Sequence, residues 1–196
     1  MLFRSEARKL ARRNIDAVPA GEFRAIVTNA AGCGSTLKEY GELLAEDPVY
    51  AKKAGEFAAR MMDITEFLAS IELNRDMGPV DATVTYQDSC HLAHGQRIRT
   101  APRQLLASVP GLTFREMAAS DVCCGSAGVY NIEQSEMAMR ILAHKMESVN
   151  SSGARIVATA NPGCLLQLQA GVRLHASGQR VMHVVEILDL AYRSFR

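Results

Sequence analysis

Four of the five cysteines in this chain lie between Tyr86 and Cys164, and their spacing suggests a shared chemical role. Cys90 is followed after 32 residues by the adjacent pair Cys123 and Cys124, and 39 further residues separate this pair from Cys164. Each cysteine lies in a short segment rich in Gly, Pro, Ser or Asp, which are turn-forming residues. Thiols carried by several separate loops are more typical of a binding site than of a hydrophobic core.

A common site for these thiols requires a sharp turn at Cys123 and Cys124, because adjacent side chains otherwise diverge. Gly125 and Gly128 favour that turn, since glycine adopts positive φ readily. A helix start is expected after them, and its N–H groups would stabilise thiolates and a negatively charged cluster. A single zinc ion is usually held by cysteine pairs with about two to four residues between them, which this chain lacks, whereas iron–sulfur clusters take four thiolates. The pattern favours a cluster, with unligated buried cysteine as the alternative.

Composition and charge narrow the class of protein. Of the 196 residues, 48% are hydrophobic and 22% are charged, which is typical of a soluble globular protein. The net charge of +1 offers no field that would attract nucleic acid or an anionic membrane. Apolar runs fall well short of the roughly 20 residues that span a bilayer, and the first residues lack the features of a secretory signal. Five cysteines without an export signal indicate reduced thiols and a cytoplasmic protein.

Hydrophobic periodicity predicts helices that alternate with short strands. In the first part we expect a helix over 3–18 ending at a turn over 19–21, a strand over 24–28, a loop over 29–33 with Cys33, and helices over 37–44, 50–62 and 63–73, the last capped by Asp63. After a linker over 74–81 we expect strands at 82–87, 112–116, 155–160 and 180–184, and helices at 101–108, 134–149, 164–176 and 184–194.

This alternation predicts an α/β fold with a mainly parallel sheet and flanking helices. The loops that carry Cys90 and Cys164 follow predicted strands, so we expect both at the carboxyl edge of the sheet, where open α/β sheets bind ligands. Arg97, Arg99 and Arg103 follow the Cys90 loop and are expected on a solvated face, with compensation of cluster charge or a docking surface as the alternative.

An internal repeat links the two parts of the chain. Segments 5–33 and 135–164 both run from Ser-Glu through a predicted helix, turn and strand to Gly-Cys, and 63–68 is similar to 183–188. The repeat predicts a pseudo-duplicated fold, in which 1–73 is the back half of a truncated first copy and 80–196 is a complete second copy, both packing as one unit. Cys33 would then be the last ligand of a second, incomplete site. Chance similarity of short amphipathic segments is the alternative.

The sequences CHLAHGQ at 90–96, CCGSAGVYN at 123–131 and NPGCLLQ at 161–167 resemble a known family. It is the cysteine-rich CCG domain of the B-type subunit of heterodisulfide reductase, of lactate-utilisation proteins and of the iron–sulfur subunit of glycolate oxidase (glycolate dehydrogenase). The resemblance covers essentially the whole chain and is closest to the carboxy-terminal part of the glycolate oxidase subunit. Asn161 stands where the family has the first cysteine of its last C-x-x-C pair.

The resemblance implies an iron–sulfur electron-transfer subunit of an acceptor-linked 2-hydroxy-acid (glycolate) dehydrogenase. A partner flavoprotein would oxidise the substrate, and electrons would pass to a quinone-type acceptor. The implied ligands of a [4Fe–4S] cluster are Cys90, Cys123, Cys124 and Cys164. We expect His91, His94 and Gly125 around them, with the histidines hydrogen-bonding to sulfur and tuning the cluster potential, and ordinary loop histidines are the alternative. We expect no catalytic residue on this chain, because neither a Ser/His/Asp arrangement nor a paired-carboxylate arrangement is evident.

Three alternatives remain open. Four thiolates also suit structural zinc, so a zinc-binding CCG domain is one alternative. The second is an iron–sulfur subunit of the lactate-utilisation type, and the third is a non-functional fragment. The missing front half of the first repeat suggests a companion polypeptide as a further partner. We expect no nucleic-acid partner and no transmembrane segment, and we leave open peripheral association with the inner membrane.

Overall fold

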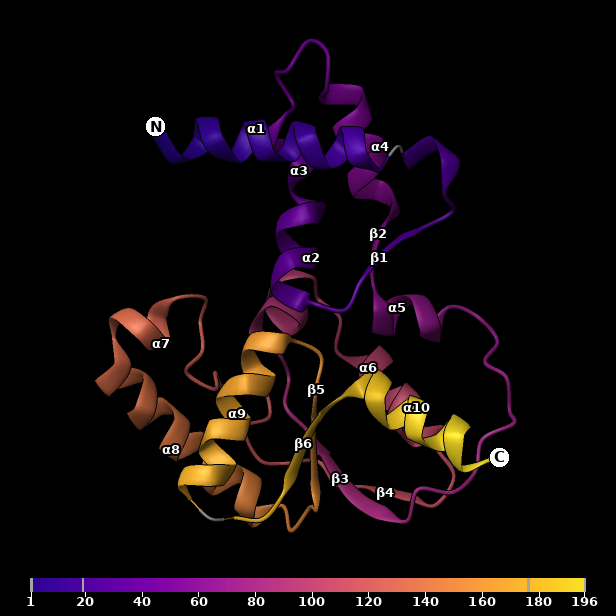
Figure 1. The fold of residues 1–196 in the computed structure, drawn as a ribbon, viewed down its shortest axis with the longest axis vertical. Helices are drawn as coiled ribbons and strands as arrows, with labels where there is room; N and C mark the ends of the chain where they lie inside the picture. The colour runs from indigo at the N-terminus through magenta and orange to yellow at the C-terminus, as the bar shows by residue number, and fades with distance from the viewer. Residues whose placement is uncertain (1, 19, 176, 196) are drawn as a thin grey trace.

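The computed structural model describes residues 2–18, 20–175 and 177–195, so Pro19 of the predicted first turn lies outside the described residues. The chain forms two sheets, one of two strands and one of four, with helices packed around them (Figure 1). All the strand pairs found in these ranges are parallel. The predicted α/β class with parallel strands and flanking helices is confirmed.

The first half of the chain builds the two-stranded sheet and a group of helices packed on it, at the top of Figure 1. Its elements are α1 (Leu2–Ala17), the 3-10 turn η1 (Ala20–Glu22), β1 (Ile26–Thr28), α2 (Ala31–Lys38), α3 (Tyr40–Leu43), α4 (Ala51–Arg60), β2 (Met61–Asp63) and α5 (Ile64–Ala69). The rings of Tyr40 and Phe57 stack with centroids 5.6 Å apart. They pack with Ala11 and Ile15 of α1, so the amphipathic face of the first helix is buried as its periodicity predicts.

The second half builds the four-stranded sheet, with strand order β4-β3-β5-β6. Its elements are β3 (Ala82–Tyr86), the π-helical turn η2 (His91–Gly95), α6 (Thr100–Ala107), β4 (Leu112–Phe114), α7 (Tyr130–Glu133), α8 (Ser135–Ser151), β5 (Ile156–Thr159), α9 (Pro162–Leu174), β6 (Arg180–His183) and α10 (Val184–Ser194).

Helices cover both faces of this sheet. Ile156 and Ala158 of β5 pack in a core with α6 and α10, whereas Val157 packs in a second core with α8 and α9. This alternation follows because successive side chains on a strand point to opposite faces. In Figure 1, α8 and α9 lie to the left of the strands, and α6 and α10 lie to the right. The sheet is therefore the middle of three layers.

The strand order creates a switch point between β3 and β5. From β3 the chain moves outward to β4 on one side, and from β5 it moves outward to β6 on the other. β3 and β5 are neighbours in the sheet, and the loops that leave them run in opposite directions. This opens a crevice at the carboxyl ends of these two strands. Ligands of open α/β sheets bind in such a crevice.

The two halves of the chain pack against each other at this same edge. α5 contacts α6 and α10, and α2 contacts η2. His183 Nε2 donates to the carbonyl oxygen of Asn29 at 3.0 Å, and Gln96 Nε2 donates to the carbonyl oxygen of Ala31 at 2.9 Å. The end of β1 is thus held close to the ends of β5 and β6.

Several predicted boundaries are wrong at the junctions between elements. The helix predicted over 50–62 ends at Arg60, because pairing with β1 draws Met61–Asp63 into β2. The helix predicted over 37–44 is divided between α2 and α3. The predicted loop over 29–33 is shorter, since α2 begins at Ala31 and contains Cys33.

The registers of the β1–β2 pair and of the β5–β6 pair correspond to each other as the internal repeat predicts. Thr28 lies opposite Asp63 in the β1–β2 pair, and Thr159 lies opposite His183 in the β5–β6 pair. Asp63 and His183 each cap the following helix, with a glutamate three residues later completing a capping box. The correspondence favours duplication, and the division into a truncated and a complete copy stays a prediction.

We expect Asp63→Ala to lower the free energy of unfolding by about 1 kcal/mol, because a helix cap is lost. Asp63 is fully buried, and its Oδ1 accepts the backbone N–H of Thr65 at 2.8 Å. Asp63→Asn keeps an acceptor at this position and should retain most of the stability. Urea unfolding measures both variants, and equal losses for Ala and Asn would contradict a capping role.

Candidate functional site

A cavity of about 270 Å³ lies at the switch point, where the two halves meet. All five cysteines of the chain line it: Cys33 from α2, Cys90 at the start of η2, Cys123 and Cys124 from the loop between β4 and α7, and Cys164 from the first turn of α9. The structure therefore brings together the four cysteines predicted as ligands. Cys90 and Cys164 lie in the first turns of helical segments rather than in open loops.

The internal repeat suggested that Cys33 belongs to a second, incomplete site. The structure instead places it beside the other cysteines. It is exposed and lines the same cavity. The backbone N–H of Gly32 donates to Asn161 Oδ1 at 3.2 Å, which ties the first turn of α2 to the residue that precedes α9. Asn161, the residue in place of a family cysteine, thus connects the two halves of the chain.

The other four thiols lie close enough to share hydrogen bonds. Hydrogen bonding with Cys123 raises the pKa of the Cys90 thiol. Hydrogen bonds from Cys124 and Cys90 lower the pKa of Cys123, and a hydrogen bond from Cys124 lowers the pKa of Cys164. The pKa of Cys124 itself is raised, first by its hydrogen bond to Cys123. The four thiols form a continuous set in which negative charge is favoured at Cys123 and Cys164.

Two amide groups donate to sulfur atoms in the cavity. The backbone N–H of Gly125 donates to Cys123 Sγ at 3.3 Å, and Asn161 Nδ2 donates to Cys164 Sγ at 3.5 Å. Gly125 has a φ of +91°, and a Cβ there would lie 2.5 Å from the carbonyl oxygen of Ala138. The turn after the cysteine pair therefore requires glycine, as expected from the sequence.

This set of donors fits an iron–sulfur cluster better than a single ion. The thiols come from segments on different sides of the cavity, and N–H donors to sulfur accompany them, as in sites that adjust cluster potentials. Within the described ranges, no three His, Cys, Asp or Glu side chains are placed so that they could hold one metal ion. Because an iron–sulfur cluster is several ångströms across, its thiolate ligands need not all point at one atom, as the ligands of a single metal ion must.

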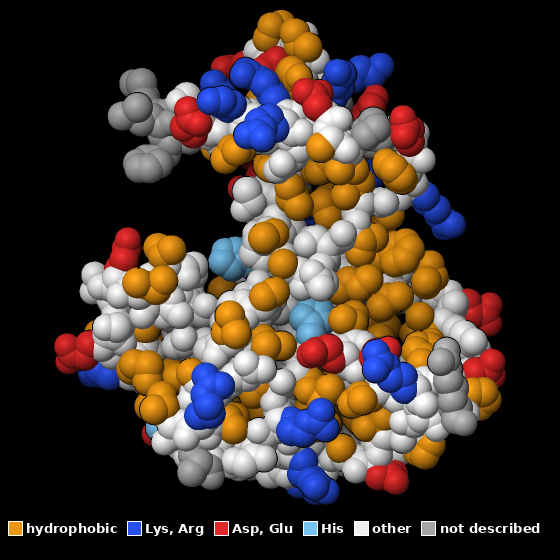
Figure 2. Space-filling view, in the orientation of Figure 1, with side chains coloured by type: hydrophobic (Ala, Val, Ile, Leu, Met, Phe, Trp, Pro, Cys, Tyr) orange, Lys and Arg blue, Asp and Glu red, His pale blue; other side chains and the backbone are white. Residues whose placement is uncertain are grey.

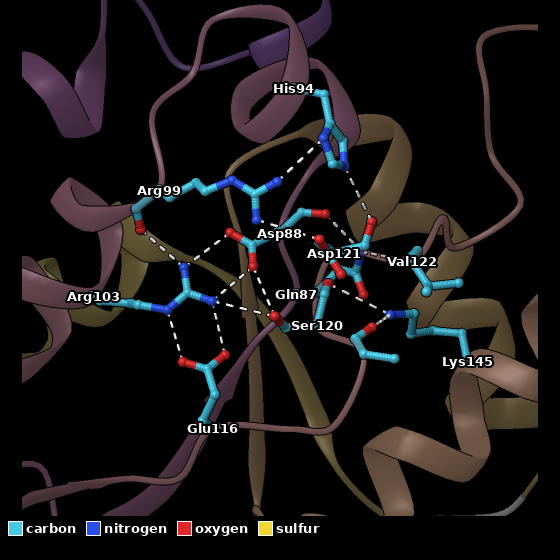
Figure 3. A network of polar contacts seen from close by, with 11 residues as sticks. Gln87, Asp88, His94, Arg99, Arg103, Glu116, Ser120, Asp121, Val122 and Lys145 are labelled. Atoms are coloured by element: carbon cyan, nitrogen blue, oxygen red, sulfur yellow. Dashed lines mark hydrogen bonds and ion pairs between the residues drawn. The ribbon is translucent and has the colours of Figure 1, made fainter.

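The two histidines of the Cys90 segment have different positions. His91 lines the cavity, with Nδ1 3.6 Å from Cys90 Sγ. His94 points toward the loop before the cysteine pair, where Nε2 donates to the carbonyl oxygen of Asp121 at 3.5 Å and Nδ1 accepts from Arg99 at 3.2 Å (Figure 3). His91 thus lies beside a cysteine sulfur, whereas His94 contacts the loop that leads to the cysteine pair.

Arg103 is the centre of a polar network beside the cavity, and the prediction that it lies on a solvated face is wrong. Its guanidinium donates to both carboxylate oxygens of Asp88, at 2.9 and 2.7 Å, and to both of Glu116, each at 2.7 Å (Figure 3). It also lies 5.1 Å from the ring centroid of Tyr86. Bidentate pairing of this kind fixes geometry as well as charge.

The same network fixes the loop that leads to Cys123. The backbone N–H of Asp88 donates to the carbonyl oxygen of Ser120 at 3.0 Å, and the Ser120 hydroxyl donates to Asp88 Oδ2 at 2.9 Å. Gln87 Nε2 donates to the carbonyl oxygen of Val122 at 3.2 Å. The sequence analysis missed these residues, although the polar run 87–89 directly after an apolar strand is a signal that could have identified them.

The helices in the described part of the chain include none that is both long and apolar enough to cross a membrane.

Comparison with known proteins gives the family and its relatives. The family described as "CCG: Cysteine-rich domain" matches residues 1–38 and 84–169. The chain is 42% identical over 189 residues to the probable glycolate oxidase iron-sulfur subunit of Bacillus subtilis, a match covering 94% of this chain and 43% of that protein. It is 30% identical over 190 residues to lactate utilization protein A of an Exiguobacterium species, a match covering 95% of this chain and 77% of that protein.

A third relative is named for a different activity. The chain is 36% identical over 168 residues to the B-type subunit of the fumarate reductase (CoM/CoB) of Methanothermobacter marburgensis, covering 85% of this chain and 32% of that protein. The chain thus spans less than half the length of this subunit and of the glycolate oxidase subunit. The shared region is therefore only part of these two proteins.

We expect Asp88→Asn to lower the free energy of unfolding by about 2 kcal/mol at neutral pH, because charged hydrogen bonds to a buried group are lost. Burial opposes ionisation of Asp88, but hydrogen bonds from Arg103 and Ser120 hold its pKa below the ordinary 3.8. A carboxyl whose pKa is lower in the folded than in the unfolded protein stabilises the fold at pH values above the unfolded-state pKa. This contribution is lost as the pH falls through the folded-state pKa. The difference between variant and wild type should therefore shrink below pH 3.8.

Urea unfolding at several pH values tests this expectation. Glu116→Gln is the matched control, because Glu116 binds the same guanidinium but is largely exposed, so its loss should cost less. A deficit of Asp88→Asn that stayed constant from neutral pH to about pH 3 would contradict the assigned ionisation.

Proposed function

Since this chain belongs to the cysteine-rich CCG domain family, we propose that it is an iron–sulfur electron-transfer subunit of a redox enzyme complex. The observation that carries this proposal is the convergence of Cys90, Cys123, Cys124 and Cys164 on one cavity at the carboxyl ends of parallel strands. The name of the Bacillus relative, an iron-sulfur subunit, supports the same role.

We assign these four cysteines as the ligands of a [4Fe–4S] cluster, since such clusters take four thiolates. When bound, the cluster supplies one-electron transfer. Gly125 and Asn161 donate hydrogen bonds to two of the ligand sulfurs, and His91 lies beside a third. These contacts would stabilise thiolate charge and orient the ligands.

The role of Cys33 follows from its position at the exposed side of the cavity. It is the most accessible of the five thiols, whereas Cys124 and Cys164 are buried. Because the other four thiols already complete a ligand set, we assign Cys33 as a non-essential neighbour of the cluster.

The complex that we propose is an acceptor-linked dehydrogenase of a 2-hydroxy acid, with glycolate as the substrate. A partner flavoprotein oxidises the substrate, and this chain relays electrons toward a quinone-type acceptor from the cytoplasmic side. The identity to the glycolate oxidase subunit, higher than that to lactate utilization protein A, favours glycolate over lactate. No catalytic residue is assigned to this chain, because the described residues that line its cavity include no carboxylate that could pair with His91.

Visible absorption and metal analysis of the anaerobically purified protein test the proposal. Broad brown absorbance with bound iron and sulfide supports it. Colourless protein with stoichiometric zinc would replace it with a structural zinc domain, and colourless protein without metal would refute both.

We expect single Cys→Ser variants at positions 90, 123, 124 and 164 to lose most of their bound iron, because a cluster that lacks one thiolate loses a bond and its charge balance. Iron content and visible absorbance per protein measure the loss. Any one of these variants that kept full iron and an unchanged spectrum would remove that residue from the ligand set.

Cys33→Ser is the matched control for these variants, since it changes the same chemical group on the same cavity. It should retain iron, and in the loaded wild-type protein Cys33 should react with a thiol reagent while the four ligands are protected. A loss of iron equal to that of Cys164→Ser would instead make Cys33 a ligand.

A further inference from the structure

A lysine is buried in the helix behind the cysteine pair. Lys145 lies on the apolar side of α8, beside the core residues Leu142 and Met146, and only 1% of its surface is exposed. Its ammonium group reaches the loop before Cys123, where Nζ donates to the carbonyl oxygen of Ala119 at 2.6 Å and lies 3.5 Å from that of Ser120 (Figure 3).

The nearby acidic groups do not neutralise this ammonium. Asp88 is paired with Arg103, and Asp121 is paired with Arg99. Among the ion pairs found in the described ranges, none includes Lys145. Its hydrogen-bond partners are neutral carbonyls, yet buried charges in proteins are normally paired. Burial lowers the pKa of Lys145, and the cysteine pair opposes this shift together with Asp121 and Asp88, so the thiols of Cys123 and Cys124 are part of the negative field around the ammonium.

The contact is fixed rather than incidental. Ala119 has a φ of +52°, which is uncommon for a residue other than glycine. Its carbonyl is held by the Lys145 ammonium, and the neighbouring Ser120 is held by Asp88. The positive charge therefore has a set place under the loop that carries two of the proposed ligands.

We propose that Lys145 is a positioning residue whose buried positive charge raises the reduction potential of the cluster held by Cys123, Cys124 and their companions. This inference rests on the proposed iron–sulfur function. Reduction adds one electron to the cluster, with no bond made or broken, so the reduced state carries one more negative charge. A nearby cation that solvent does not screen stabilises that state preferentially.

The test compares Lys145→Gln with Lys145→Arg in the full chain, reconstituted anaerobically with ferrous iron and sulfide. Glutamine can still donate to the carbonyls but has no charge, whereas arginine keeps the charge. The control is Arg140→Gln, which removes a positive charge from the exposed side of the same helix. Circular dichroism and thermal melting establish that each variant folds, and redox titration followed by visible absorbance gives the potential.

We expect Lys145→Gln to reduce the ratio of reduced to oxidised cluster about tenfold at a fixed ambient potential, a downward shift of about 59 mV for one electron. Lys145→Arg and Arg140→Gln should stay close to wild type. If Lys145→Gln folds but fails to retain iron while Lys145→Arg retains it, the charge is needed to hold the cluster, and the assigned effect on the potential is overturned.

Other outcomes overturn the inference. An unchanged potential in an iron-loaded Lys145→Gln would show that the ammonium only supports the loop. Loss of folding or of iron in both Lys145 variants would make the position one of packing. If wild type itself bound no iron, the proposed function would fail and this inference with it, whereas the other outcomes leave the function intact.

Discussion

The parallel pairing of β3 with β5 is the constraint on which the rest of the site depends. Val84 lies opposite Ile156 and Tyr86 lies opposite Ala158, and the ladder continues beyond the strand when the N–H of Gln87 donates to Ala158 at 2.8 Å. Two segments that are far apart in the sequence therefore leave the sheet side by side. Because the chain then departs in opposite directions toward β4 and β6, the space above the pair stays open and the cysteines can line it.

Two arginines beside this space, Arg99 and Arg103, are paired with acidic side chains. Arg103 binds two carboxylates, and the surface of the molecule in Figure 2 shows acidic and basic side chains scattered over both halves rather than gathered in one field. Neutral groups line most of the cavity itself, including Gln87, Ser126 and Asn161. Lys145 differs from Arg103, because none of the ion pairs found in the described ranges includes its buried ammonium.

The sequence predicted the second half of the chain well, because its elements are signalled locally. Strands such as 156–159 are short apolar runs, and the glycine that follows the cysteine pair specifies the turn. The errors have one common cause, which is that long-range packing decided the outcome. Met61–Asp63 becomes a strand only because β1 lies beside it, and Cys33 joins the cavity only because α2 packs on η2. The local sequence around Met61–Asp63 or Cys33 gives no information about β1 or η2, the elements that these segments pack against.

Arg103 shows the same limit for charged residues. In a run with Arg97 and Arg99 it has the pattern of a solvated face, but the fold brings Asp88 and Glu116 to it from two other segments. Lys145 differs, since a lysine on the apolar side of a predicted helix is itself a signal. The side that repeats Leu142, Met146 and Val149 includes Lys145, and a charge in that position calls for an opposite charge inside the fold.

Burial across the cavity is graded, and this gradient bears on how a cluster there would exchange electrons. Cys124 and Cys164 are buried against the core that α8 and α9 form with the sheet, Cys90 and Cys123 are half-buried, and Cys33 is exposed. A cluster held between them would have one edge in a dry environment and the opposite edge near the surface. The dry edge would limit the access of water to the bonds between the cysteines and a bound cluster, and the open edge would give a partner protein a short path to it. Cys33 belongs to α2, which packs against η2, so the exposed side of the cavity lies at the junction of the two halves of the chain.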